Sequence, residues 1–216
     1  QEEALYKVLK ETIIASQNIR FEGDGYSDEW KDEAARRGLT NICHVPEAIM
    51  KFNDPQSRSV LIGEKIFNEN ELNCRIEVEL EKFTKKVQIE SRVLGDLAIN
   101  HIVPTAVIYQ NRLLENLRGL KEIFSTEEYE EMTADRKDLV REIQRRILSI
   151  KKAVHDMTEA RKVANHLGSQ VEKAFSYEEK VRPYLEEIRE HIDSLELEID
   201  DEIWPLPKYR ELLFTK

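Results

Sequence analysis

Apolar residues recur with a helical period through the middle of the chain, from Asn68 to Phe124. From Ile76 the spacing alternates between four and three residues if Glu90 counts as one step, which is typical of a helix packed lengthwise on others. Asn68, followed three residues later by Glu71, matches a capping box. We therefore expect a helix over about 69–101, roughly 45–50 Å long at ~1.5 Å per residue, in an elongated molecule. Its apolar positions are Leu72, Ile76, Leu80, Phe83, Val87, Leu94 and Leu97.

The apolar pattern changes phase at Pro104. A proline removes a backbone donor and clashes with the preceding turn of a helix. The downstream stripe is out of register with the upstream one, so we expect a kink or a short break near Val103. Its members are Ala106, Gln110, Leu113, Leu117, Leu120 and Phe124.

Two further long patterns follow. Ser125, with Glu127 and Glu128, predicts the start of a helix that ends before Gly168. The last long pattern contains Pro183, and Ser176 with Glu179 predicts a capping-box restart there. The apolar positions of the two patterns are Leu139, Ile143, Ile147, Ile150, Val154, Met157 and Ala164, then Val181, Leu185, Ile188, Ile192, Leu195 and Ile199. We expect a mainly α fold, an elongated bundle of long antiparallel helices near 69–101, 127–167 and 177–198, with a run of short helices at its N-terminal end.

The two ends of the chain differ from this middle region. Residues 1–67 predict a first helix, the turn-rich loop FEGDGYSDEW and three short helices. Residues 201–216 carry Trp204 between acidic residues and two prolines, and we expect this segment to dock near Tyr26 and Trp30. The expected division is therefore 1–67, 68–200 and 201–216, within one domain.

Composition narrows the class of protein. The formal net charge of −10, with 35% charged and 7% aromatic residues, argues against a nucleic acid or an anionic membrane as partner. We find no apolar stretch near the ~20 residues that span a bilayer. Cys43 and Cys74 are too few for a disulfide framework, which favours reduced thiols and a cytoplasmic location. A helical pattern already runs next to Gln1, so we expect the chain to be a piece of a longer one.

The glycine-rich loop offers little chemistry. Gly23–Asp24–Gly25 lacks the Gly-Lys-Ser/Thr ending of a phosphate-binding loop, and its acid stands where an anion would bind. Asp24 and Asp28 do not have the glycine and distal glutamate of a calcium loop. We interpret this stretch as a structural turn.

The histidines do not match a metal-binding or catalytic pattern. They are His44, His101, His155, His166 and His191, and none follows a glutamate by three residues, as a di-metal carboxylate bundle requires. Glu90 and His101 fall on the apolar seam, where we expect buried polar groups, with Arg92 or Arg112 as candidate partners of the carboxylate. We predict no catalytic, cofactor-binding or metal-binding residue in this chain.

Three motifs carry a resemblance to one family. They are FEGDGYSDEW at 21–30, QIESRVLGDL at 88–97 continuing through HIVPT to NRLLE at 111–115, and DEIWPLPKYRELLF at 201–214. Together they resemble the C-terminal region of type III glutamine synthetases, the large bacterial form, over essentially the whole chain.

The resemblance implies a function for the parent enzyme rather than for this stretch. Such enzymes make glutamine from glutamate and ammonia with ATP and a divalent metal, Mg or Mn, and assemble as two stacked hexameric rings. The implied partners are the catalytic part of the same chain and neighbouring subunits. The family's catalytic motifs lie upstream, so no catalytic residue is carried over.

Two other hypotheses for the function of the chain remain open. The heptad stripes and acidic surface also suit a freestanding coiled-coil scaffold or adaptor, and a metal-binding helical-bundle enzyme is a third possibility. The residues alone do not distinguish a domain that regulates the parent from one that braces it or joins its rings.

Overall fold

The computed structural model describes residues 2–213, with Tyr209 and Arg210 described by their backbone alone. The chain separates after His44 into two compact units. Regular structure in the described range is helical, which confirms the predicted mainly α fold. The expected division placed its first boundary after residue 67, whereas the contacts place one after residue 44, because the short helices beyond it pack on the long bundle.

The first unit contains helix α1 (Glu2–Ala15), a 3-10 turn (Gln17–Ile19) and helix α2 (Asp28–Arg36). Ser27 caps α2 as the sequence predicts, its hydroxyl oxygen accepting a hydrogen bond from the Trp30 amide. Beyond α2, Gly38 adopts a φ of 71°, a left-handed conformation that favours glycine.

Polar contacts join α2 to the segment before it. The guanidinium of Arg37 donates to the backbone oxygens of Asn18 and Arg20, at 3.0 and 2.6 Å, and also to the carboxylate of Glu33. The rings of Phe21 and Trp30 lie 5.0 Å apart. This unit is therefore organised mainly by hydrogen bonds and one aromatic pair.

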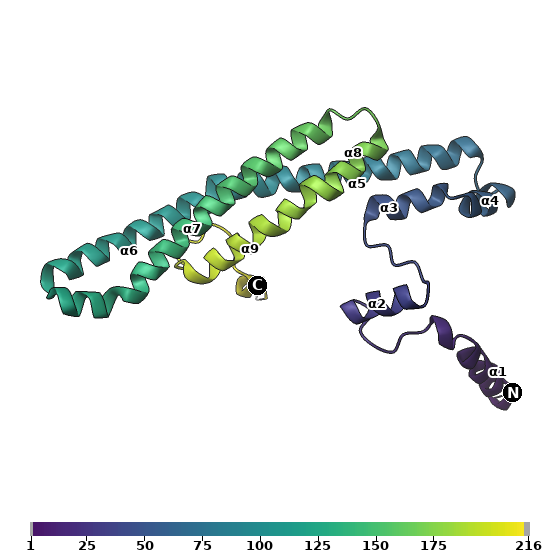
Figure 1. The fold of residues 1–216 in the computed structure, drawn as a ribbon, viewed down its shortest axis with the longest axis horizontal. Helices are drawn as coiled ribbons and strands as arrows, with labels where there is room; N and C mark the ends of the chain where they lie inside the picture. Colours follow the sequence, from purple (N-terminus) through teal and green to yellow (C-terminus); the bar gives the residue numbers. More distant parts are fainter. Residues whose placement is uncertain (1, 214–216) are drawn as a thin grey trace. The chain divides into compact units, whose positions relative to one another are not determined.

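The second unit begins with short helices that lead into a long one (Figure 1). Helix α3 (Val45–Met50), a 3-10 turn (Lys51–Asn53) and helix α4 (Pro55–Gly63) precede helix α5 (Glu69–Leu97). The predicted capping box is present in both directions: Glu71 N donates to Asn68 Oδ1 at 2.9 Å, and Asn68 N donates to Glu71 Oε2 at 2.8 Å.

A π turn at Ala98–Ile102 joins α5 to helix α6 (Val103–Ile123) and explains the change of apolar phase. Pro104 would clash with the carbonyl of Asn100 in a regular α-helix, and the wider turn relieves that clash. The extra residue also rotates α6 relative to α5. The predicted irregularity near Val103 is thus a π turn within one continuous rod.

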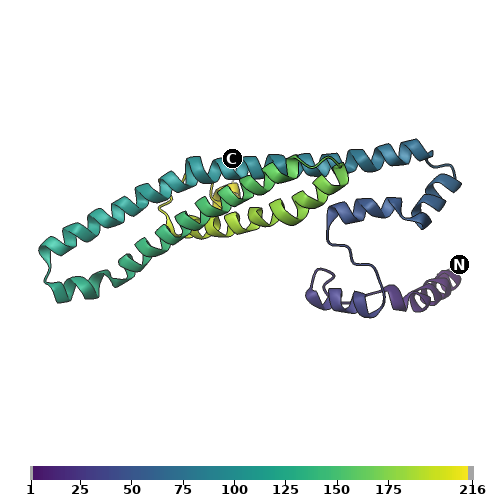
Figure 2. The same cartoon turned by 45° about the horizontal axis from the view of Figure 1, so that its top comes forward.

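The return path is formed by helix α7 (Thr126–Asn165), which runs antiparallel to α5 and α6 (Figure 2). At ~1.5 Å per residue, its 40 residues extend about 60 Å, so this unit is elongated. Ser125 and Glu128 form its capping box, at the predicted start.

The last long rod contains a second π turn. Helix α8 (Gln170–Ser176) continues through the π turn Tyr177–Val181 into helix α9 (Arg182–Glu198). The predicted restart at Ser176 is wrong: the helix does not stop, because the π turn displaces the Glu179 carbonyl that Pro183 would meet. Both prolines inside long helices therefore follow a π turn by two residues.

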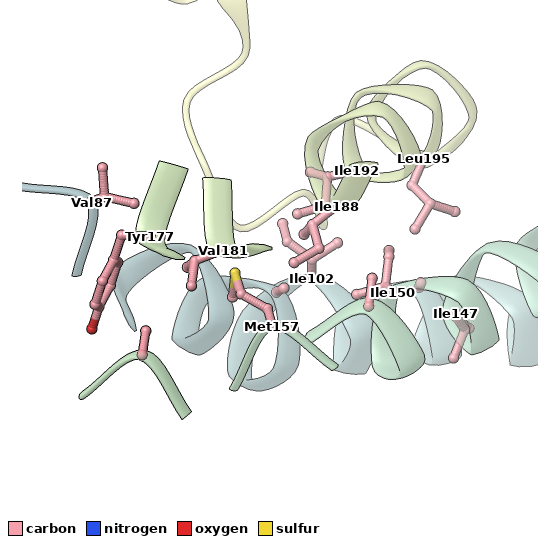
Figure 3. Packing of buried hydrophobic residues seen from close by; sticks show 14 of the residues in the cluster. Val87, Ile102, Ile147, Ile150, Met157, Tyr177, Val181, Ile188, Ile192 and Leu195 are labelled. Atoms are coloured by element: carbon pink, nitrogen blue, oxygen red, sulfur yellow. The ribbon is translucent and has the colours of Figure 1, made fainter. Parts of the chain in front are cut away.

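The core of the second unit lies between α5, α7 and α9 (Figure 3). The predicted side-by-side packing of these helices is confirmed, and each residue named below is buried as expected from the stripes. They are Leu80, Phe83, Val87, Ile143, Ile147, Ile150, Met157, Val181, Ile188, Ile192, Leu195 and Ile199.

The segment after α9 docks, as predicted, but on the second unit itself. Trp204 is 8% exposed and belongs to the core of that unit, followed by the short helix α10 (Tyr209–Leu212). Lys208 Nζ donates to the carbonyls of Glu196 and Ile199, at 2.6 and 3.2 Å, so a cation stands at the C-terminus of α9. The sequence predicts a docking surface near Tyr26 and Trp30, whereas Trp204 gains its burial within the core of the bundle.

Candidate functional site

The glycine-rich loop uses its own oxygens to form a turn. Asp24 Oδ1 accepts a hydrogen bond from the Tyr26 amide at 2.9 Å, and the Ser27 hydroxyl donates to the Asp24 carbonyl at 2.8 Å. Asp28 pairs with Lys31 at 2.6 Å. These are the local bonds of a structural turn that leads into α2.

His166 contacts its own helix, whereas His191 on α9 faces an arginine on α7. His166 Nδ1 lies 2.7 Å from the Lys162 carbonyl oxygen, and His191 Nδ1 lies 3.4 Å from an Arg146 nitrogen. Across the described residues, His, Cys, Asp and Glu side chains do not gather in groups of three that could hold a metal ion. Cys43 and Cys74 are both exposed, and neither forms a disulfide.

The expectation that Glu90 and His101 are buried on the seam is wrong. The Glu90 side chain is 48% exposed and lies 3.9 Å from Lys86, and His101 is exposed as well. A straight α-helix advances 3.6 residues per turn, so the seam steps from Val87 to Ser91, which is fully buried. Neither expected partner reaches Glu90; Arg112 instead pairs with Asp200 at 3.2 Å.

The buried, paired carboxylate of this bundle is Glu178. Its side chain is 5% exposed, and its two oxygens lie 2.8 and 3.1 Å from Arg182 Nη1. The pair spans the π turn before Pro183, one helical turn apart. The sequence signal for this pair was Pro183, which lies inside a continuing apolar pattern. A proline there indicates an irregular turn, and such a turn changes which residues face the core.

A polar cluster links three helices beside the core. The Tyr177 hydroxyl donates to Asn165 Oδ1 at 2.8 Å, and Gln88 Nε2 lies 3.4 Å from the same oxygen. In Figure 3 the Tyr177 ring lies beside Val181 and its hydroxyl points away from the labelled core residues. Burial raises the pKa of Tyr177, and the charge of Arg161 acts in the opposite direction.

Arg161 itself lies in an unusual environment. Burial lowers the pKa of its guanidinium, and the positive charge of Arg92 lowers it further. Two like charges therefore face the Tyr177 cluster, and sequence spacing alone did not reveal that they come together.

A groove of about 690 Å³ runs along the first half of α5. Phe67, Cys74 and Val78 supply its apolar part, and Arg75 lies 5.0 Å from the centre of the Phe67 ring. Glu71 and Lys82 at its borders give it mixed charge. It offers a surface for contact rather than a set of groups that converge on one atom.

Comparison with known proteins gives a consistent result. The family model "Glutamine synthetase C-terminal domain" matches residues 4–121. A glutamine synthetase of Bacteroides fragilis (strain YCH46) is 76% identical over the whole chain, which covers 30% of that relative. A type-3 glutamine synthetase of Dictyostelium discoideum is 27% identical over 99% of the chain and 29% of its own length, and a glutamine synthetase of Butyrivibrio fibrisolvens is 28% identical over 99% and 30%.

The chain thus spans just under a third of the length of the curated relatives it matches. Within the described range, every helix is too short or too polar to cross a membrane. The family model covers more than half of the chain, and the sequence motifs named above pointed independently to the same family. The chain belongs to the glutamine synthetase C-terminal domain family.

Proposed function

We propose that this chain is the C-terminal helical domain of a type III glutamine synthetase and that it serves assembly rather than chemistry. The parent enzyme would make glutamine from glutamate, ammonia and ATP. The observation that carries the proposal is the family match over residues 4–121, supported by the 76% identity to a glutamine synthetase along the whole chain. The name of the Dictyostelium relative supports the type III assignment.

ATP and the divalent metal, Mg or Mn, would bind in the catalytic part of the parent. The described residues do not fit a metal, because they do not bring three potential ligands together. We therefore derive no catalytic step from this chain. The exposed thiols of Cys43 and Cys74 support a cytoplasmic parent.

Helix α1 supports a role in contact with the rest of the parent. Each residue of this helix in the described range is exposed, although it carries a broad apolar face. Leu5, Leu9 and Ile13 lie along the middle of that face at helical spacing, and Ile14 lies on the opposite side. An apolar helical face of this kind is stable in an enzyme only when another surface covers it. The proposed partners are the catalytic part of the same chain and neighbouring subunits, in two stacked hexameric rings.

Two substitutions in the full-length parent test this role. Leu9→Glu would bury a charge in the proposed contact, so we expect loss of the large assembly in size-exclusion chromatography and at least a tenfold fall in glutamine synthesis. Ile14→Glu makes the same chemical change on the opposite face and should preserve both. In the 216-residue chain alone, neither variant should change the melting temperature, because both side chains are exposed at 52% and 60%.

The results separate the proposal from its alternative. If Leu9→Glu assembles and works as well as Ile14→Glu, the apolar face of α1 has no role in the parent. A freestanding scaffold would also be favoured if the reading frame upstream of Gln1 encoded no catalytic part. In either situation the 216-residue chain should not bind Mg-ATP, and calorimetry that detects micromolar binding would contradict the assignment of chemistry to the rest of the parent.

A further inference from the structure

The antiparallel register of α5 and α7 places two arginines face to face. Gln88 on α5 meets Asn165 on α7, where their side chains lie 3.4 Å apart. One helical turn forward on α5 is Arg92, and one turn back on α7 is Arg161, so these residues are opposite each other. The same register recurs at Gly95, where an added Cβ would lie 3.5 Å from Met157 Cε.

Neither arginine has an acidic partner among the described residues, although the chain carries ten more acidic than basic side chains. Most other arginines on the long helices pair with an acidic residue. Both Arg145 and Arg146 pair with Glu142, and Arg182 pairs with Glu178. At Arg92 and Arg161 the positions one turn away do not supply a carboxylate in contact. Two guanidinium groups thus repel each other across a helix interface without local compensation.

Hydrogen-bond donors complete the cluster. Asn165 Oδ1 accepts from both Tyr177 and Gln88, so the amide nitrogen of Asn165 is left to donate. Tyr177 is fully buried and holds this arrangement in place. The site therefore combines two forked cations with a fixed amide donor at the junction of three helices.

We propose that Arg92 and Arg161 bind a small phosphate-type oxyanion, with the Asn165 amide as a further donor. Guanidinium groups match the geometry of phosphate oxygens and can bind two of them at once. A dianion at this position would neutralise both arginines and remove their repulsion. The overall charge of −10 opposes general anion binding, so binding here must come from the local cluster.

The test is the melting temperature of the 216-residue chain in phosphate and in chloride at equal ionic strength. With a dissociation constant of about 1 mM, 10 mM phosphate should raise the melting temperature by roughly 3 °C. Arg161→Gln and Arg92→Gln should each reduce this rise below about 0.5 °C. Arg118→Gln, which removes the same charge from an exposed position on α6, should retain the full rise.

A second readout separates ligand binding from a structural role. In chloride, Arg92→Gln should melt no lower than the unchanged chain, because it relieves repulsion at an exposed position. Glycerol 3-phosphate distinguishes the ligand source: an equal rise indicates that the site accepts a phosphomonoester, and a rise with phosphate alone indicates a free anion. The proposal is overturned if phosphate and chloride give the same melting temperature, or if the arginine variants keep the phosphate-dependent rise.

Discussion

The two units of this chain use apolar residues in opposite ways. In the second unit the stripes of α5, α7 and α9 meet in one continuous core that includes Ile150 and Trp204. In the first unit, Ala34 is the one buried apolar residue among residues 2–44, while the apolar face of α1 is exposed. The same helical period thus predicts a helix in both units, but it predicts burial within the unit in only one.

This difference shows that a hydrophobic stripe predicts a helix but does not by itself predict which surface will cover the apolar face. Apolar burial supplies most of the stability of a helix in water, because helical propensity alone is marginal at the 14 residues of α1. An apolar stripe that packs against other helices of its own unit becomes core, as at Leu80 and Ile188. An apolar stripe that stays exposed within its unit is suited to an interface, which is the role proposed for α1.

The largest expected contrast comes from truncating one side chain in each unit. Ile150→Ala should cost roughly 2–5 kcal/mol of unfolding free energy, since Ile150 is fully buried between long helices. Leu9→Ala should change it by less than about 0.5 kcal/mol. Urea unfolding followed by circular dichroism measures both, and equal losses would show that the two stripes are equivalent.

Removing the docked segment should have a smaller effect. Truncation after Glu202 deletes Trp204 and Lys208, and we expect a loss of roughly 2–3 kcal/mol from the buried ring together with the cap of α9. The melting temperature of the truncated chain and its binding of a hydrophobic dye measure this loss. An unchanged melting temperature would mean that the segment does not stabilise the bundle.

Acid should affect the first unit through Glu33. Hydrogen bonds from Arg36 and then Arg37 lower the pKa of this carboxyl from 4.5 to about 2. Because the folded pKa lies below the unfolded one, the stabilisation is complete above about pH 4.5 and is lost as the pH falls towards 2. Trp30 fluorescence, followed in a Trp204→Phe background, should change within that range.

Glu33→Gln is the control for this titration. It removes the titrating group, so it should weaken the contacts of α2 at neutral pH and abolish the change between pH 4.5 and 2. If the variant and the unchanged chain titrate alike, another group controls the acid response.

The smallest expected effect is at Glu90. Glu90→Gln should alter the unfolding free energy by less than about 0.5 kcal/mol, because the carboxylate is half exposed and its contact with Lys86 is long. A larger loss of stability in thermal unfolding would indicate that the Glu90 carboxylate is buried.

The helix starts and much of the burial in the second unit could be predicted from the sequence, because capping residues and apolar spacing are local signals. The capping residues Asn68 and Ser125 and the stripe from Leu80 to Val87 predicted helix starts and burial correctly. Glu90 was misplaced because a strict heptad drifts from the 3.6-residue period of a straight helix, which places Ser91 inside.

The remaining features depend on long-range geometry. Pro104 and Pro183 indicated irregular turns. The sequence alone did not indicate that a π turn would keep each helix continuous. The opposition of Arg92 and Arg161 depends on the register of α5 against α7, which periodicity within each helix does not determine. The burial of Trp204 in the core of the bundle likewise depends on packing between distant segments.

Hydrogen exchange of α1 tests the central claim most directly. The account predicts that amides of Glu2–Ala15 exchange rapidly in the 216-residue chain and slowly in the full-length parent, while amides around Ile150 are protected in both. Strong protection of α1 in the 216-residue chain, equal to that in the parent, would contradict the claim that its apolar face awaits a partner outside this chain.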